Sequence, residues 1–389
     1  MENSKAVLRF DYASNTTSCH TPFKMDKFQS KPRGFDSVVN EAPATHQRGF
    51  TSKKYNPFDL KNTKDLTAEL CPSISDPDNP SKPLIRVITN KFPALSAPLS
   101  QATLQCLHHK TCATMDACGF QEVIIQHWLW NKCQALLTQE QMELLWASLA
   151  ERSRVNANKL NVKYVQVMEN HGPRSGASLP HPHSQILALP FVPFDQQNRL
   201  DIAKNWYTKT NECLFTHLIH GARTDGRVVI ETEHTIAFIP FAINRSYETW
   251  IVSKTSPTME CEKYMNEMSN TIRKVLLALY HLQNDPDYNS IVRQAPVSSI
   301  TMNGQTTLPK DWYRWHVVVT PHGKTGRWAG IKGYGDFVPI SGTPEEQTLQ
   351  LKECLRYPCP ESTSTQVNKS RTILLALVVF FGVSWCIKK

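Results

Sequence analysis

The residues best suited to chemistry lie in one short segment, Asn170–Gln185, which contains glycines, an arginine and two histidines. His181 and His183 are two residues apart, so on a strand both side chains would point to the same face. A glycine-rich turn before them can direct backbone N–H groups at an anion. A neutral imidazole beside such a turn is suited to attack phosphorus and form a covalent nucleotidyl-histidine. Gln185 can donate to a phosphate oxygen as charge develops there. Taken alone, the His-Pro-His triplet favours a plainer interpretation, a loop with two surface histidines.

The helices and strands expected around this segment occur in the same order in both halves of the chain. In the first half, an amphipathic helix over Thr138–Asn156 begins with the capping box Thr138-x-x-Gln141. Strands are expected around it at 84–95, 120–127, Val162–Glu169 and after residue 170.

In the second half, Ser256-Pro257 is expected to open a helix, with proline at the first helical position. Strands are expected over Val228–Phe241, Glu248–Lys254, Ser298–Met302 and Trp315–Thr320. The repeated order predicts an α+β fold in which two units join or pack their antiparallel sheets and flank them with helices.

Composition limits the class of protein. Of the 389 residues, 40% are hydrophobic and 20% charged, which excludes a disordered or fibrous chain. The formal net charge of +9 suits a protein that handles anionic small molecules, and it does not require nucleic acid. Eleven cysteines are too few for a disulfide scaffold. The N-terminal residues lack the apolar stretch of a secretory signal, so we expect the body of the protein in the cytosol.

The C-terminal segment Thr372–Ile387 is uniformly apolar and is flanked by Lys369, Arg371, Lys388 and Lys389. As a helix it would span roughly 24 Å, against about 30 Å for the hydrocarbon core of a bilayer. The flanking basic side chains could snorkel and make up the difference. We therefore expect a transmembrane helix that anchors the protein by its tail to the mitochondrial outer membrane or the endoplasmic reticulum. A buried terminal helix or strand is the alternative.

The segment Asn170–Gln185 also resembles the active-site signature of the galactose-1-phosphate uridylyltransferase family, in the histidine triad superfamily. Its motif Gly176-Ala-Ser-x-x-His-Pro-His-Ser-Gln185 is most similar to the branch that includes ADP-glucose phosphorylase. Other family blocks occur in the family's order, at Asn90–Leu95, Gly119–Ile125, Glu231–Phe241, Glu248–Ile251, Arg314–Val317 and Ala329–Gly333.

The resemblance implies two histidine-triad-like units, and it suggests boundaries along the chain. We expect an irregular arm over 1–70, a catalytic unit over 71–200 and a second unit over 201–356. A polar linker over 357–371 and the membrane anchor over 372–387 would follow. A homodimer is also implied, because members of the family commonly build the site across an interface.

The resemblance further assigns roles to individual residues. His183 aligns with the nucleophile, and Gln185 aligns with the glutamine that steadies the nucleotidyl phosphate. The residues implied to bind substrate are Gly176 and Ser178 at the phosphates, Asn170 near the α-phosphate and ribose, and Asn90 and Phe92 at the base and ribose. Arg174 is added on its charge alone, because a guanidinium in this loop could pair with a phosphate.

The zinc site found in many family members is incomplete in this sequence. The expected Cys-x-x-Cys pair reads Cys71-Pro-Ser-Ile74, and the expected later histidine is Trp130, with His127 three residues out of register. Only Cys71 and His181 remain, and two ligands do not make a tetrahedral site. We therefore expect no metal cofactor. Zinc held by His127, Cys71 and His181 is the alternative.

A second metal site of some members is also altered. Its His-x-His motif reads Arg314-Trp-His316 here, and another expected histidine is Arg293. Each arginine puts a fixed positive charge where a metal ion would bind.

The function that the resemblance implies is a nucleotidyltransferase or phosphorylase. His183 would attack the α-phosphorus of a nucleoside-diphosphate sugar, and a sugar 1-phosphate would leave. A phosphate or a second sugar 1-phosphate would then accept the nucleotidyl group. Two alternatives remain, namely a nucleotide hydrolase of the histidine triad type and a catalytically inactive, membrane-tethered nucleotide-binding protein.

Overall fold

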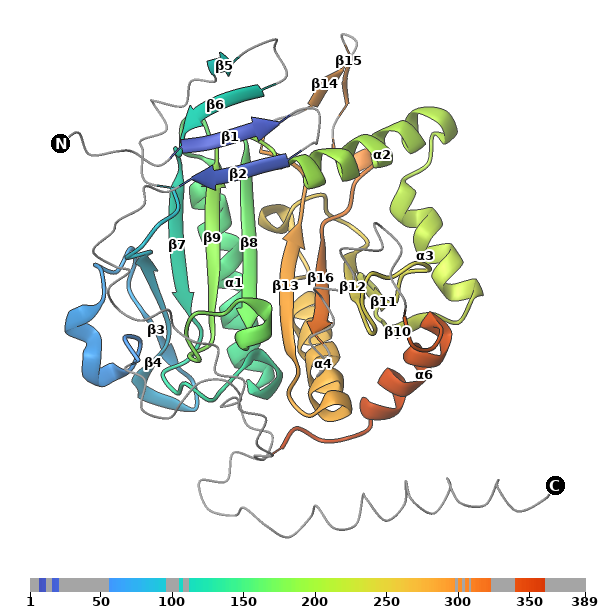
Figure 1. Cartoon of the computed structure of the whole chain (residues 1–389). Coiled ribbons are helices and arrows are strands. Elements are labelled where there is room, and N and C mark those ends of the chain that lie inside the picture. The colour runs from blue at the N-terminus through green and yellow to red at the C-terminus, as the bar shows by residue number, and fades with distance from the viewer. Residues whose placement is uncertain are drawn as a thin grey trace, which may run out of the picture. The chain divides into compact units, whose positions relative to one another are not determined.

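One antiparallel sheet of ten strands runs through the described part of the chain (Figure 1). Its strands are β3 (Ile74–Asp76), β4 (Asn79–Thr89), β7 (Phe120–Ile125), β8 (Tyr164–His171), β9 (His183–Leu189), β10 (Val228–Glu231), β11 (Thr235–Phe238), β12 (Thr249–Ser253), β13 (Asp287–Arg293) and β16 (His316–His322). Their order across the sheet is β10-β11-β12-β16-β13-β8-β9-β7-β4-β3.

The structure is a computed structural model that describes residues 7–11, 16–20, 56–95, 105–107, 112–297, 300–302, 305–307, 309–322 and 340–360. Residues up to Tyr357 form one unit, and a second unit begins at Pro358. Everything that follows concerns the first unit.

The strand order shows an internal repeat. In each half the chain forms a hairpin, a third strand, a long helix and then two more strands. Across the sheet, the hairpin lies at the outer edge, the third strand comes next, and the last two strands lie towards the centre, as β9 and β8 in the first half and β16 and β13 in the second. The two copies join because β8 pairs antiparallel with β13, with Tyr288 opposite His171. The expected order of strands around a helix is therefore present twice, and the two sheets are continuous. In the second half, however, β13 takes the place of the strand expected at Ser298–Met302, of which residues 300–302 lie in a separate two-stranded sheet.

The two long helices, α1 (Gln139–Ala157) and α4 (Met265–Gln283), pack side by side on one face of this sheet (Figure 1). The capping box at Thr138 and Gln141 is present, as the sequence predicted. The side chains of α1 at helical spacing are buried against the strands: Met142, Leu145, Trp146 and Leu149. Burial of these apolar side chains is the main stabilisation that this face provides.

The opposite face is covered mainly in the second half. There α2 (Phe194–Thr210) and α3 (Leu214–Thr224) enclose a separate apolar cluster that includes Leu200, Phe215 and Trp312. A short helix, α6 (Pro344–Cys354), packs against α4 and β10. In the first half no long helix lies on this face among the described residues, and the functional side chains are found there.

Two sequence predictions about the second half are wrong. The helix expected at Ser256-Pro257 begins instead at Met265, because Ser256 and Pro257 accept backbone hydrogen bonds from Trp315 and Ala295, which hold this segment out of a helix. Strand β13 was not predicted, because a polar residue, Ser290, is buried and an apolar one, Ile291, points outward, which breaks the alternating pattern.

Smaller elements complete the described chain. Within the arm predicted to be irregular, β1 (Val7–Asp11) and β2 (Thr16–His20) pair with each other, and β1 also pairs with β6 (Cys112–Asp116). The remaining strands are β5 (Gln105–Leu107), β14 (Ile300–Met302) and β15 (Gln305–Thr307).

The prediction of a transmembrane helix, and with it a tail-anchored location on a membrane, is corrected by the structure. None of the helices in the described ranges is both long and apolar enough to cross a bilayer. The predicted segment 372–387 itself lies outside the described residues.

The capping box of α1 gives a direct stability test. Replacing Thr138 with alanine removes the side-chain acceptor of the Gln141 N–H, so we expect the free energy of unfolding in urea to fall by about 1 kcal/mol. Thr138→Ser keeps a hydroxyl and should stay close to wild type. Equal stability of the alanine and serine variants would contradict this account of the helix start.

Candidate active site

Strands β8 and β9 place the predicted chemistry on one face of the sheet. Their register puts Met168 opposite Gln185 and Glu169 opposite Ser184. Because side chains alternate along a strand, His183, Gln185 and Asn170 share a face. Their neighbours Val167 and Ile186 belong to the core beneath α1 and α4, so the three functional side chains lie on the face away from those helices.

His183 is the first residue of β9, and its imidazole is buried. Its Nδ1 lies 2.8 Å from the carbonyl oxygen of His181. A carbonyl only accepts, so the neutral ring carries its proton on Nδ1 and its lone pair on Nε2. Burial lowers the pKa of His183 below its ordinary value, which favours this neutral form. The geometry therefore provides a nucleophilic nitrogen with fixed orientation.

Two hydrogen bonds, one at each ring nitrogen, hold the His181 side chain in place. Its Nε2 donates to the carbonyl oxygen of His127 at 2.7 Å, and its Nδ1 accepts from the Asn56 side chain at 3.0 Å. The ring of Phe58 meets His181 and His183 edge-on, with centroids 5.8 and 5.3 Å away. The segment 56–58 thus fixes both histidines and shields them from water.

Gln185 is oriented by a second glutamine. Gln121 on β7 donates from Nε2 to the Gln185 Oε1 at 2.7 Å, while its own Oε1 accepts from the Ala94 N–H at 2.9 Å. The Gln185 oxygen is therefore occupied, which leaves its amide N–H₂ group to donate to substrate. Gln121 also accepts the Asn90 N–H through its backbone carbonyl. It therefore links the predicted base-binding turn to the predicted catalytic glutamine.

That turn presents an exposed aromatic ring. Asn90 accepts the Phe92 N–H through its side chain at 2.9 Å, and Phe92 is 72% exposed. An exposed ring on a fixed turn is suited to stack on a planar base. The backbone of Asn90 is bonded to Gln121, and the base-binding role of Asn90 and Phe92 stays a prediction.

Asn170 is oriented across the junction of the two halves. Asn289 on β13 donates to its Oδ1 at 2.6 Å and to the Ser175 carbonyl at 3.0 Å. The Oδ1 of Asn289 lies 2.5 Å from the His322 Nε2. The pKa of His322 is lowered to about 4 by burial and by the positive charges of Arg245 and Arg174. Several cationic or hydrogen-bonding groups from both halves thus surround Asn170.

The turn between β8 and β9 has a fixed backbone. Gly172 has φ +81°, and a Cβ atom there would lie 2.3 Å from the Asp287 Oδ1, so only glycine fits. Asp287 also accepts the Arg174 N–H at 2.6 Å. The N–H groups of Gly176 and Ala177 bond within the turn, to Pro173 and Gly172. The turn exposes the side chains of Arg174 and Ser178, and their phosphate contacts stay predictions.

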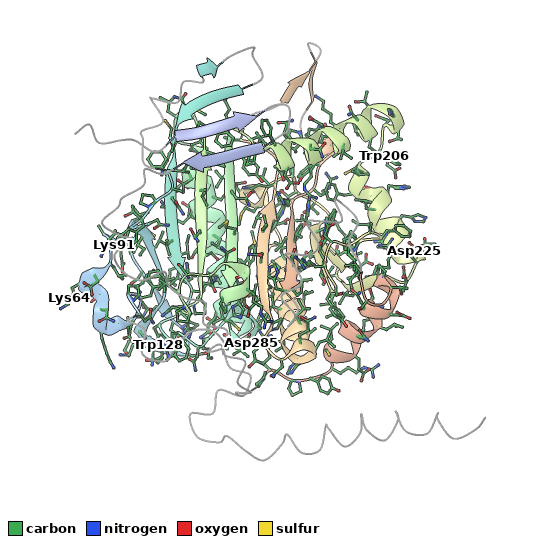
Figure 2. All side chains as sticks on the ribbon, viewed as in Figure 1. Lys64, Lys91, Trp128, Trp206, Asp225 and Asp285 are labelled. Atoms are coloured by element: carbon green, nitrogen blue, oxygen red, sulfur yellow. The ribbon has the colours of Figure 1, made fainter. Side chains whose placement is uncertain are left out.

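The residues at the family's zinc positions do not fit that metal. Cys71 lies among Ile85, Val87 and side chains of α1, on the helix-covered face, whereas His181 contacts Asn56 and Phe58 on the other face. His127 is bonded to the Leu129 N–H and lies 3.5 Å from Asp76, which also accepts from Trp128 beside the β3–β4 hairpin (Figure 2). Both ring nitrogens of His181 are hydrogen-bonded, and burial lowers the pKa values of His127 and His181 to about 4, which keeps both rings neutral.

The second half contains a closed counterpart of the site. His316 is the first residue of β16, as His183 is of β9, and its Nδ1 lies 3.0 Å from the Arg314 carbonyl. Rings of Phe215, Trp250 and Tyr313 surround it, and burial lowers its pKa to about 3. Each half therefore has a histidine at the start of the corresponding strand. His316 is enclosed by the α2–α3 cluster, whereas His183 lies outside it.

At the family's second metal site, two arginines stand in place of histidine ligands. Arg293 lies opposite His316 and forms an ion pair with Asp195 at 2.6 Å, which Arg199 also contacts. Arg314 donates to backbone carbonyls of Lys254 and Lys310. The cationic side chains oppose a metal ion at this place.

Asn56, Phe58, Gln121 and Asn289 are site residues that the sequence reasoning missed. Asn56 and Phe58 lie in the stretch expected to be an irregular arm, and Asn289 lies in the missed strand β13. Gln121 lies within a quoted family block, but its role rests on the contact with Gln185, which no short sequence pattern reveals.

Comparison with known proteins agrees with this geometry. A family model for the N-terminal domain of galactose-1-phosphate uridyl transferase matches residues 26–193. The galactose-1-phosphate uridylyltransferase of Thermotoga maritima is 30% identical over 248 residues, which cover 60% of this chain and 74% of that protein. The ADP-glucose phosphorylase of Arabidopsis thaliana is 26% identical over 340 residues, covering 86% and 88%.

Solved structures share the fold. A uridylyltransferase superimposes with a TM-score of 0.67 at 20% identity and covers 90% of this chain and 98% of that one. The Arabidopsis ADP-glucose phosphorylase with bound ADP-glucose gives 0.64 at 22% identity, covering 89% and 98%. The chain belongs to the galactose-1-phosphate uridylyltransferase family, as its motifs predicted, and it is a nucleotidyltransferase.

The contact between Gln121 and Gln185 gives a test of this site. Gln121→Leu removes the group that holds the Gln185 amide, so we expect nucleotidyl transfer to slow roughly tenfold in kcat with little change in KM. Gln185→Ala should cost more, and adding Gln121→Leu to it should cost nothing further. Independent, multiplicative losses would show that Gln121 does not act through Gln185.

Proposed function

We propose that this enzyme cleaves a nucleoside-diphosphate sugar in two displacement steps through a nucleotide bound covalently to His183. The observation that supports this most is the Nδ1–H of His183 bonded to the His181 carbonyl, which leaves Nε2 as the nucleophile. The reported activities of the related uridylyltransferases and phosphorylase point to the same substrate class.

In the first step the His183 Nε2 forms a bond to the α-phosphorus, and the bond from that phosphorus to the bridging oxygen breaks. The leaving group is a sugar 1-phosphate. The amide of Gln185 donates to the oxygen on which charge develops, and the Nδ1–H bond to His181 stabilises the imidazolium character of the attacking ring.

In the second step an oxygen of the acceptor attacks the same phosphorus, and the bond to Nε2 breaks. Inorganic phosphate as acceptor yields a nucleoside diphosphate, and a sugar 1-phosphate yields a new nucleoside-diphosphate sugar. The long match to ADP-glucose phosphorylase supports phosphate as the acceptor. The positive charges of Arg174 and Arg245 near His322 support a role for them in holding the acceptor phosphate.

We further propose that these steps need no metal at the family's positions. The support is the donor set itself: both ring nitrogens of His181 are hydrogen-bonded, Cys71 lies across the sheet, and arginines take the second position.

A substrate panel tests the proposed function. The protein is mixed with ADP-glucose or UDP-glucose, with phosphate, galactose 1-phosphate or no acceptor. We expect release of one sugar 1-phosphate per site without acceptor, and continuous turnover with parallel-line kinetics only when phosphate or a sugar 1-phosphate is added.

The control variants are chosen by position. His183→Asn should lower turnover on the order of 10⁴-fold, whereas His220→Asn, at an exposed position on α3, should not change it. Continuous formation of nucleoside monophosphate without acceptor would instead identify a hydrolase. Nucleotide binding without any release would identify an inactive nucleotide-binding protein.

A further inference from the structure

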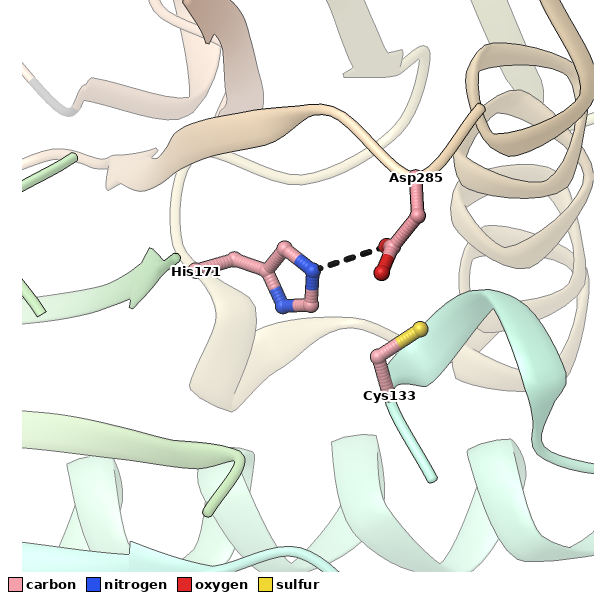
Figure 3. A group of neighbouring side chains, drawn as sticks. All are labelled: Cys133, His171 and Asp285. Carbon is pink, nitrogen blue, oxygen red and sulfur yellow. Dashed lines mark hydrogen bonds and ion pairs between the residues drawn. The ribbon is translucent and has the colours of Figure 1, made fainter. Parts of the chain in front are cut away.

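A second cluster of reactive side chains lies on the helix-covered side of the sheet. Cys133, His171 and Asp285 bring a sulfur, an imidazole nitrogen and a carboxylate oxygen within 4.8 Å of one another (Figure 3). The His171 Nε2 is 3.1 Å from the Asp285 Oδ1. His171 is two residues from Glu169 on β8, so it points away from the face that carries Asn170 and His183.

Each of the three side chains is positioned by regular structure. Cys133 is the N-cap of the short 3₁₀ helix at Gln134–Leu136, and its carbonyl accepts the Leu136 N–H. His171 ends β8, and its ring stacks on Tyr288 with centroids 4.6 Å apart and planes at 13°. Asp285 follows the C-terminus of α4 with φ +56° and donates its N–H to the Tyr280 carbonyl. Three separate segments therefore converge on one buried point.

A second carboxylate, that of Glu169, lies next to this cluster. The Glu169 carboxylate lies 4.0 Å from the other ring nitrogen of His171. It also accepts hydrogen bonds from side chains that hold it in place: Gln126, Gln134 and Tyr288. At 4.0 Å the Glu169 oxygen is beyond hydrogen-bond distance of the His171 ring, so Glu169 adds negative charge beside the cluster.

We propose that Cys133, His171 and Asp285 bind a divalent transition-metal ion, with Zn²⁺ as the best fit. Zinc accepts a mixture of sulfur, nitrogen and oxygen ligands in tetrahedral geometry. At zinc–ligand distances of about 2.0–2.3 Å, tetrahedral ligand atoms lie roughly 3.3–3.8 Å apart. The His171–Asp285 contact is already near that spacing, and the Cys133 sulfur has at most about 1 Å to move.

The ion also suits the charge of the cluster. Two carboxylates, Glu169 and Asp285, face the single imidazole of His171 in a buried place. A dication would offset two of the three negative charges of these carboxylates and the Cys133 thiolate, which it would bind in place of the thiol proton. Such a site would tie together the end of β8, the end of α4 and the segment before α1. The three protein ligands leave the fourth tetrahedral position to a water molecule. None of them faces His183, so the site lies apart from the nucleophile.

Metal binding is tested without any activity measurement, so the result is independent of the proposed function. The full-length protein is stripped with a chelator, loaded with Zn²⁺ alone and gel-filtered, and the retained zinc is counted by mass spectrometry. We expect one zinc per chain, with affinity weakened at least about tenfold in Cys133→Ser and in Asp285→Asn. Asparagine tolerates the positive φ of residue 285, so the second variant should keep the backbone.

Two controls and a spectrum make the test decisive. Cys213→Ser, at a buried cysteine of the α2–α3 cluster, and Cys71→Ser should both keep the zinc. With Co²⁺ in place of zinc, the wild-type protein should show a thiolate-to-metal charge-transfer band, and Cys133→Ser should abolish it. If Cys133→Ser does not fold, the same band should be weakened in Asp285→Asn. Absence of retained zinc, retention unchanged in Cys133→Ser and Asp285→Asn, or dependence on Cys71 would each overturn the proposal and leave a hydrogen-bonded cluster.

Discussion

The hydrogen bond from the His183 Nδ1–H to the His181 carbonyl is the interaction on which the rest of the site depends. It decides which ring nitrogen carries the lone pair, and it can form only if residue 181 has left the strand while residue 183 begins it. Asn56 and the His127 carbonyl hold His181 in that place, and Phe58 covers both rings. The chemistry therefore rests on a backbone contact supported by two distant segments, residues 56–58 and the chain at His127.

The duplicated fold explains why there is one such site and not two. The same contact recurs between His316 and the Arg314 carbonyl at the start of β16. There α2 and α3 cover the sheet, and aromatic rings such as Phe215 and Tyr313 enclose the histidine. The first-half face lacks such helices among the described residues, so the presence or absence of a covering layer distinguishes a reactive histidine from a core histidine.

Sequence reasoning succeeded where local pattern determines structure and failed where distant contacts do. The capping box at Thr138 and the motif ending in His183 and Gln185 were readable, because propensity and spacing encode them locally. Strand β13 was missed because buried Ser290 and outward Ile291 break the alternation of apolar and polar residues. The start of α4 was misplaced because a backbone hydrogen bond from Trp315 holds Ser256 out of a helix, and the roles of Asn56 and Gln121 depend on contacts that no short pattern reveals.

The covalent intermediate is the central claim, and trapping it is the most direct test. The protein is incubated without acceptor with a nucleoside-diphosphate sugar labelled at the α-phosphorus, then denatured in base and digested. We predict one label per chain, labile in acid and stable in base, on the peptide that contains His183, with the phosphorus on Nε2. Label on another peptide, label on Nδ1, or sugar 1-phosphate released without any labelled peptide would contradict the account.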